Sequence, residues 1–204
     1  RDGGNAADAL VAVQAMLGLV EPQSSGLGGG AFLVWYDAKE KRLTTFDGRE
    51  TAPAEATPSL FLDANGKPLP FYDAVVGGRS VGTPGTVRLL EAVHGKYGSK
   101  DWKGLFGQAI DLAEKGFAVS PRLHGEIAED MGRLDHQPAA RAYFYDQDGK
   151  PLAVGATLKN PAYAETLRAI ASGGADAFYT GRIASDIVAA VRALDRVLIS
   201  GHYV

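Results

Sequence analysis

Apolar positions recur at helical spacing along most of the chain. Leu10, Val13 and Leu17 repeat every three or four positions, which predicts a first helix over residues 5–19. The asparagine that opens this range is a suitable N-cap, and Asp8 places a carboxylate in the first turn, where the helix dipole favours negative charge. The same reasoning predicts further helices over residues 85–97, 102–115, 120–135, 160–172 and 181–194.

Strand-like segments are fewer. Residues 31–37 (AFLVWYD) predict a buried strand, and residues 43–47 predict a second strand that returns as a hairpin after a charged turn. Residues 143–145 (YFY) indicate a short extended piece. Residues 48–80, which are rich in proline and glycine, predict a long irregular connection, and such connections are often functional.

Helices therefore outnumber strands, which indicates an α+β chain. Two strands cannot form a sheet whose two faces are both covered by this chain, so we expect half of a layered assembly whose other strands lie elsewhere. We interpret residues 1–204 as a single domain. Residues 63–69 and 146–152 have similar sequences (DANGKPL and DQDGKPL), which we interpret as reuse of turn chemistry instead of a repeated domain.

Composition excludes several classes of function. Apolar residues make up 46% of the 204 positions and charged residues 22%, values that allow a sizeable core. The net charge of −3 does not favour nucleic acid, and no apolar stretch is long enough for a membrane span. The chain has no cysteine, which excludes disulfides and thiolate sites. No histidine is spaced with another as a metal pair, so we expect neither a metal nor a cofactor; the four are His94, His124, His136 and His202.

Two glycine motifs match known fingerprints only in their letters. Residues 26–31 fit a dinucleotide motif, but the predicted order is helix, glycines, strand, whereas the motif needs strand, glycines, helix. Residues 78–82 (GRSVG) fit the nucleophile elbow around Ser80, which requires a strand that runs straight into a helix. For the first motif, the preferred interpretation is that the glycines allow positive φ and close approach of the backbone between layers. For the second, a structural turn is preferred and a serine nucleophile is the alternative.

The segment DGRETAP at residues 47–53 is the most informative. It lies where a strand ends and a long loop begins, a common place for ligand contacts. The guanidinium of Arg49 offers parallel N–H donors that can bind a carboxylate with two hydrogen bonds. The residues alone leave open a structural ion pair between Arg49 and Asp47 or Glu50.

Four motifs in the same order carry a family resemblance. The segments at residues 3–37, 47–53 (DGRETAP), 77–87 (GGRSVGTPGTV) and 113–123 (AEKGFAVSPRL) together resemble γ-glutamyltransferases. The resemblance implies part of a four-layer αββα N-terminal-nucleophile hydrolase sandwich, with this chain as the helix-rich large-subunit portion. It departs from the family pattern at residues 195–204, whose placement stays open.

The resemblance also implies a function. In this family a precursor cuts itself into a large and a small subunit, and the N-terminal threonine of the small subunit is the nucleophile. No catalytic residue is then expected in this chain, and Arg49 is expected to bind the α-carboxylate of a γ-glutamyl substrate such as glutathione, which is hydrolysed or transferred to amino acids or peptides. A cephalosporin (glutaryl) acylase on the same scaffold and a non-catalytic interaction subunit are the alternatives. The expected location is the bacterial periplasm or the exterior, and the opening RDGG suggests a processed start.

Overall fold

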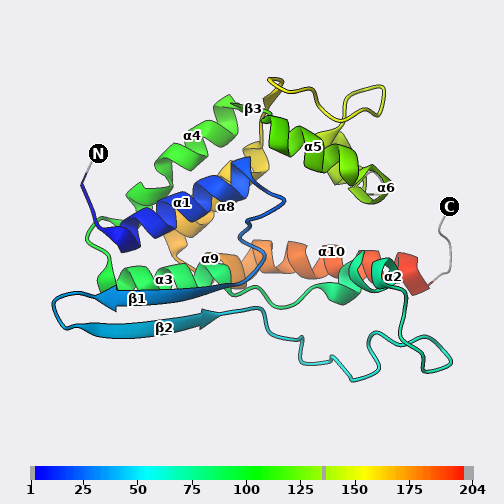
Figure 1. Ribbon diagram of the computed structural model, residues 1–204, viewed down its shortest axis with the longest axis horizontal. Helices are drawn as coiled ribbons and strands as arrows, with labels where there is room; N and C mark the ends of the chain where they lie inside the picture. The colour runs from blue at the N-terminus through cyan, green and yellow to red at the C-terminus, as the bar shows by residue number, and fades with distance from the viewer. Residues whose placement is uncertain (1–2, 135–136, 200–204) are drawn as a thin grey trace. The chain divides into compact units, whose positions relative to one another are not determined.

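The computed structural model describes residues 3–134 and 137–199 (Figure 1). The chain divides into two compact units: a helical unit of Arg1–Leu27 and Leu90–Gly174, and a hairpin unit of Gly28–Leu89 and Ala175–Val204. Residues 200–204 of the tail lie outside the described residues. The interpretation of the chain as a single domain stays a prediction.

The helical unit is built almost entirely of helices. They are α1 (Ala6–Val20), the part of α3 (Thr86–Tyr97) that begins at Leu90, the 3-10 helix η2 (Trp102–Phe106), α4 (Gly107–Lys115), α5 (Pro121–Glu129), α6 (Met131–Leu134), α7 (Pro138–Phe144) and α8 (Pro161–Gly173). Two short strands, β3 (Phe117–Ala118) and β4 (Thr157–Leu158), pair antiparallel. The predicted helices at 85–97 and 160–172 are confirmed. The one predicted at 120–135 is confirmed as far as Leu134 but is divided into α5 and α6, and its predicted last residue lies outside the described residues.

Helix α1 confirms the first predicted helix. Asn5 caps it, and Asp8 completes a reciprocal capping box by accepting a hydrogen bond from the Asn5 backbone. Ala7 and Ala15 are fully buried, and their small side chains allow neighbouring helices to approach closely. The Tyr163 hydroxyl on α8 donates a hydrogen bond to the Ala15 carbonyl at 2.9 Å, and burial raises the pKa of this tyrosine.

Two sequence predictions in this unit are wrong. The single helix expected over 102–115 is a 3-10 turn followed by α4, because Gly104 and Gly107 weaken the α-helical preference and the Trp102 indole is fixed by a hydrogen bond to the Ile170 carbonyl. The extended piece expected over 143–145 is mostly the end of α7. That helix begins at Pro138, and the alanines after it favour helix over the strand preference of the aromatic run.

The hairpin unit contains the long antiparallel ribbon of β1 (Ala31–Asp37) and β2 (Arg42–Gly48), which confirms the predicted hairpin (Figure 1). It also holds α2 (Phe71–Val75), the 3-10 turn η1 (Gly78–Ser80), the first four residues of α3, α9 (Asp176–Tyr179) and α10 (Gly181–Ile199). The connection 48–80 is therefore less irregular than predicted, and α10 extends beyond the predicted end at 194. The mixture of helices and strands confirms the α+β expectation.

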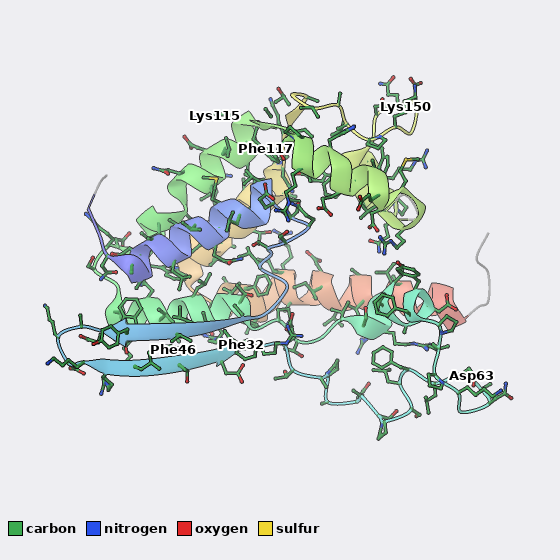
Figure 2. All side chains as sticks on the ribbon, viewed as in Figure 1. Phe32, Phe46, Asp63, Lys115, Phe117 and Lys150 are labelled. Carbon is green, nitrogen blue, oxygen red and sulfur yellow. The ribbon has the colours of Figure 1, made fainter. Side chains whose placement is uncertain are left out.

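The prediction of a buried strand at residues 31–37 is wrong for one face of β1, which is exposed. Its side chains alternate, and Phe32, Val34 and Tyr36 are 69%, 64% and 60% exposed. Leu43 of β2, which pairs with Tyr36, is 62% exposed on the same face. Figure 2 labels Phe32 on this face and Phe46 of β2, which is half-buried. The exposed apolar face shows that the described chain covers only one side of the ribbon.

The two similar segments form similar turns, as predicted. The Asp63 carboxylate accepts hydrogen bonds from the backbone N–H groups of residues 65 and 67, both at 2.8 Å. The Asp146 carboxylate accepts from those of residues 148 and 150, at 3.0 and 2.8 Å. Asp63 and Lys150 are labelled in Figure 2.

Among the helices that the structure describes, none has the length and hydrophobicity needed to cross a membrane.

Candidate functional site

Arg49 is the first residue after β2, at a bend fixed by Asp47. The Oδ1 atom of Asp47 accepts a hydrogen bond from the backbone N–H of Arg49 at 2.9 Å, so this carboxylate satisfies the main chain. The Arg49 guanidinium instead lies beside Glu50, with 3.2 Å between Nη1 and Oε2. Of the two ion pairs that the sequence left open, the one with Glu50 is formed.

Glycines allow neighbouring segments to lie against the Arg49 bend. A Cβ atom on Gly30 would come within 2.8 Å of the Arg49 Cα and 2.7 Å of the Glu50 nitrogen. A Cβ atom on Gly85 would overlap the Gly48 carbonyl oxygen, and one on Gly82 would lie 2.9 Å from the Glu50 Cβ. The glycines of the GLGGG and VGTPG motifs therefore serve close backbone packing.

Main-chain hydrogen bonds join the same segments. The backbone N–H of Thr51 donates to the Thr83 carbonyl at 3.2 Å, and the N–H of Thr83 donates to the Thr51 carbonyl at 2.8 Å. The N–H groups of Gly85 and Thr86 both donate to the Gly29 carbonyl, at 3.0 and 3.1 Å. These bonds bring the DGRETAP segment beside the segment that precedes α3, although the two are about thirty positions apart in sequence.

Arg49 faces an open hollow of about 420 Å³, within the range of small-ligand sites. The hollow is lined by residues 49–53, by Phe61 and by residues 79–82. The Arg49 side chain is 64% exposed, and an ion pair at such a position contributes only about 0–1 kcal/mol. The buried Glu50 Oε2 has no hydrogen-bond partner among the described residues, so its contact with Arg49 is an ion pair without hydrogen-bond geometry. Most of the five guanidinium N–H donors are therefore available to a ligand.

Ser80 is not in a nucleophile elbow. It ends the 3-10 turn η1, which follows the short helix α2 where the elbow would need a strand. Its hydroxyl donates hydrogen bonds to the carbonyls of Val75 at 2.7 Å and Gly77 at 3.3 Å. The hydroxyl closes a structural turn, and the interpretation of Ser80 as a nucleophile is wrong.

Comparison with known proteins places the chain in a family. Residues 1–199 match the family model described as Gamma-glutamyltranspeptidase. The chain belongs to the gamma-glutamyltranspeptidase family. It is 43% identical over 187 residues to the glutathione hydrolase proenzyme of Bacillus subtilis (strain 168), an alignment that covers 92% of this chain and 32% of that relative. The chain thus spans about a third of the length of this relative.

Solved structures agree with the family assignment. The structure of Helicobacter pylori gamma-glutamyltranspeptidase matches with a TM-score of 0.89 and 33% identity, over 98% of this chain and 58% of that chain. The cephalosporin acylase from Bacillus halodurans matches with a TM-score of 0.77 and 29% identity, over 92% of this chain and 35% of that chain. These matches confirm the predicted fold class: the chain is a helix-rich α+β portion of an N-terminal-nucleophile hydrolase.

A second polar cluster of this gamma-glutamyltranspeptidase-family chain lies in the helical unit. Asp8 is only 3% exposed, and its carboxylate accepts hydrogen bonds from the Ser99 hydroxyl at 2.6 Å and from the backbone N–H groups of Asn5, Ser99 and Lys100 at 2.8–3.1 Å. Burial raises the pKa of Asp8, but these bonds outweigh burial and hold that pKa well below its usual range. The cluster is structural: it joins the start of α1 to the loop after α3.

Sequence reasoning missed this role of Asp8, because Ser99 is 91 positions away. His94 lies beside the cluster, with Nε2 3.4 Å from an Asp8 oxygen and 3.0 Å from the Lys100 carbonyl.

His124 is the other histidine that the structure describes, and it shares a hydrogen bond of 2.8 Å with the Leu152 carbonyl. His136 and His202 lie outside the described residues. Across residues 3–134 and 137–199, no group of three or more potential metal ligands occurs.

Proposed function

We propose that this chain is the large-subunit portion of a γ-glutamyltransferase or glutathione hydrolase, in which Arg49 binds the α-carboxylate of the γ-glutamyl group. The observation that carries the proposal is the position of Arg49 on the rim of the open hollow, with most of its donors available. Family membership supplies the reaction class. The close packing of glycines around the bend supports a fixed position for the Arg49 backbone.

The proposed reaction divides the work between two polypeptides. A threonine at the N-terminus of a companion small subunit attacks the γ-carbonyl carbon with its Oγ, and its own α-amine accepts the hydroxyl proton. The tetrahedral intermediate expels the leaving amine, which takes up that proton, and an acyl ester with the threonine remains. Water or the amine of an amino acid or peptide then attacks the ester and releases the threonine.

Arg49 contributes to this reaction by positioning. Two parallel hydrogen bonds from the guanidinium to the α-carboxylate fix the amino-acid end of the substrate. Three carbons separate the γ-carbonyl from this carboxylate, so the γ-carbonyl is held near one distance from the threonine, and this removes rotational freedom before the chemical step. The role is binding and orientation, and no proton moves at Arg49.

The exposed apolar face of the ribbon supports a companion polypeptide. Phe32, Val34 and Tyr36 stand side by side with Leu43 on one face, and contiguous exposed apolar surface of this kind usually marks an interaction site. We propose that the companion subunit covers it. The proposed place of action is the periplasm or the exterior of a bacterial cell, which the absence of cysteine allows.

A cephalosporin acylase is the second candidate, since the acylase from Bacillus halodurans shares the fold. Both activities need an amide whose acyl part carries a carboxylate for Arg49. The deciding experiment isolates the assembled protein, identifies the N-terminal residue of any companion chain, and compares turnover of glutathione with that of a glutaryl cephalosporin. Preferential glutathione turnover with an N-terminal threonine supports the proposal. Preferential glutaryl turnover favours the acylase, and the absence of a companion chain and of turnover favours the interaction subunit.

A further inference from the structure

A second arginine, Arg79, lines the hollow that Arg49 faces. It is half-buried and stands in the middle of the 3-10 turn η1. This turn is held by the Ser80 hydrogen bond to the Val75 carbonyl and packs against α10. Gly77, at the start of the turn, has a φ of 121°, which favours glycine. Arg79 is therefore presented from a fixed piece of backbone.

Arg79 differs from most arginines of the described chain in having no carboxylate beside it. Arg42, Arg88 and Arg168 form ion pairs with Glu40, Asp176 and Glu114, at 2.9, 2.7 and 2.6 Å. Among the side chains that the structure describes, in residues 3–134 and 137–194, no carboxylate oxygen lies within 4.0 Å of the Arg79 guanidinium. A half-buried cation without a counter-ion is costly, and a ligand that supplies negative charge would offset this cost.

Two arginines and one glutamate line the hollow, and only one of the two arginines has a carboxylate beside it. Arg49 and Arg79 contribute two positive charges, and Glu50 is the single acidic residue among those that line it, so the lining carries a net positive charge. One carboxylate bound at Arg49 neutralises this excess, and Glu50 stays beside Arg49 at 3.2 Å. The Arg79 charge is then still without a local partner.

We propose that Arg79 binds a second carboxylate, carried by the leaving group of the substrate, and so selects γ-glutamyl peptides with a free C-terminal carboxylate over neutral γ-glutamyl amides. The inference rests on the proposed function, since it takes Arg49 to hold the α-carboxylate. The volume of about 420 Å³ is sufficient for a small peptide that reaches both arginines. Arg79 is a specificity-determining residue in this account, and it takes no part in the acyl transfer.

The test compares two substrates that differ at one group, γ-glutamylglycine and γ-glutamylglycinamide, with the assembled enzyme. The measured quantity is the ratio of their kcat/KM values, acid over amide. We expect the unaltered enzyme to prefer the acid by about five- to twentyfold, because a charged hydrogen bond in a partly open site is strong but screened. We expect Arg79→Gln to bring the ratio close to one, and Arg79→Lys to retain part of the preference because it keeps the charge. Arg42→Gln, which removes an exposed arginine on the ribbon, is the matched control and should leave the ratio as it was.

The outcomes separate this inference from the proposed function. If the unaltered enzyme turns over both substrates at equal efficiency, or if Arg79→Gln keeps the full preference, the role of Arg79 is overturned while the proposed function stands. If the unaltered enzyme turns over neither substrate, the proposed function fails first. If Arg79→Gln is not folded, Arg79→Lys decides: a reduced acid preference supports the inference, and an unchanged one contradicts it.

Discussion

Thr51 and Thr83 exchange two backbone hydrogen bonds, of 3.2 and 2.8 Å, and this bridge joins the loop after β2 to the segment before α3. Arg49 lies two residues before the first threonine, and Arg79 lies four residues before the second. The segments that carry the two arginines of the hollow are thus joined by main-chain hydrogen bonds, and glycines allow this close approach.

Gly85 has the least space for a side chain among these glycines, because a Cβ atom there would overlap the Gly48 carbonyl oxygen. We expect Gly85→Ala to destabilise the protein by about 1–3 kcal/mol, the usual cost of forcing extra atoms into a packed site, and to weaken substrate binding by moving the Arg49 bend. Gly95→Ala on α3 is the matched control. Its Cβ meets no atom within 4 Å, so we expect a gain of up to about 1 kcal/mol from better helix propensity. Urea denaturation measures both, and equal stability of the two variants would contradict the packing role of Gly85.

Asp8 should make the stability of the protein depend on pH below about 4. Its pKa is lower in the folded protein than the ordinary 3.8, so the stabilisation is present above the ordinary value and is lost as the pH falls toward the folded pKa. We expect Asp8→Asn to be less stable than the unaltered protein at pH 7, and the difference to shrink at pH 3. Denaturation curves at the two pH values check this, and a difference that grows on acidification would refute it.

Ser80 should be dispensable for the chemical step. We expect Ser80→Ala to lower kcat/KM for a γ-glutamyl substrate by less than about fivefold, through loosening of η1, whereas loss of a true nucleophile costs on the order of a thousandfold or more. Steady-state kinetics with the assembled enzyme decide between these. A thousandfold loss in a folded variant would restore Ser80 as a nucleophile.

The apolar face of the ribbon should be required for assembly. We expect Val34→Asp to reduce recovery of the companion polypeptide by tenfold or more, because burying an unpaired carboxylate costs several kcal/mol. Val154→Asp in the helical unit is the control, since Val154 is also an exposed valine, at 52% against 64% for Val34, and it belongs to a different unit of the chain. Equal recovery of the companion with both variants would show that this face is not the interface.

Local features were predictable from the sequence, and long-range ones were not. The capped start of α1 and the ribbon depend on residues close in sequence. The prediction of an extended piece at 143–145 is wrong, because the preceding Pro138 and the alanines that follow it favour helix there.

The candidate site likewise combines a feature that is predictable from the sequence with features that are not. Arg49 was identifiable because its motif follows a predicted strand and resembles a known family. The choice between Asp47 and Glu50 as its partner, and the presence of Arg79 in the same hollow, depend on backbone contacts across about thirty positions. No periodicity or motif encodes those contacts, so Arg79 was not predictable as a site residue.

The role of Arg49 in substrate binding is tested most directly by the kcat/KM of Arg49→Gln for a γ-glutamyl substrate in the assembled enzyme, with Arg42→Gln as the control. Removal of a charged hydrogen-bonding group costs about 1.5–3 kcal/mol, which is roughly a 10- to 150-fold loss of kcat/KM, carried mainly by a higher KM. We predict a loss of this size for Arg49→Gln and less than about twofold for Arg42→Gln. An Arg49→Gln enzyme that is folded, assembled and has an unchanged KM would contradict the account.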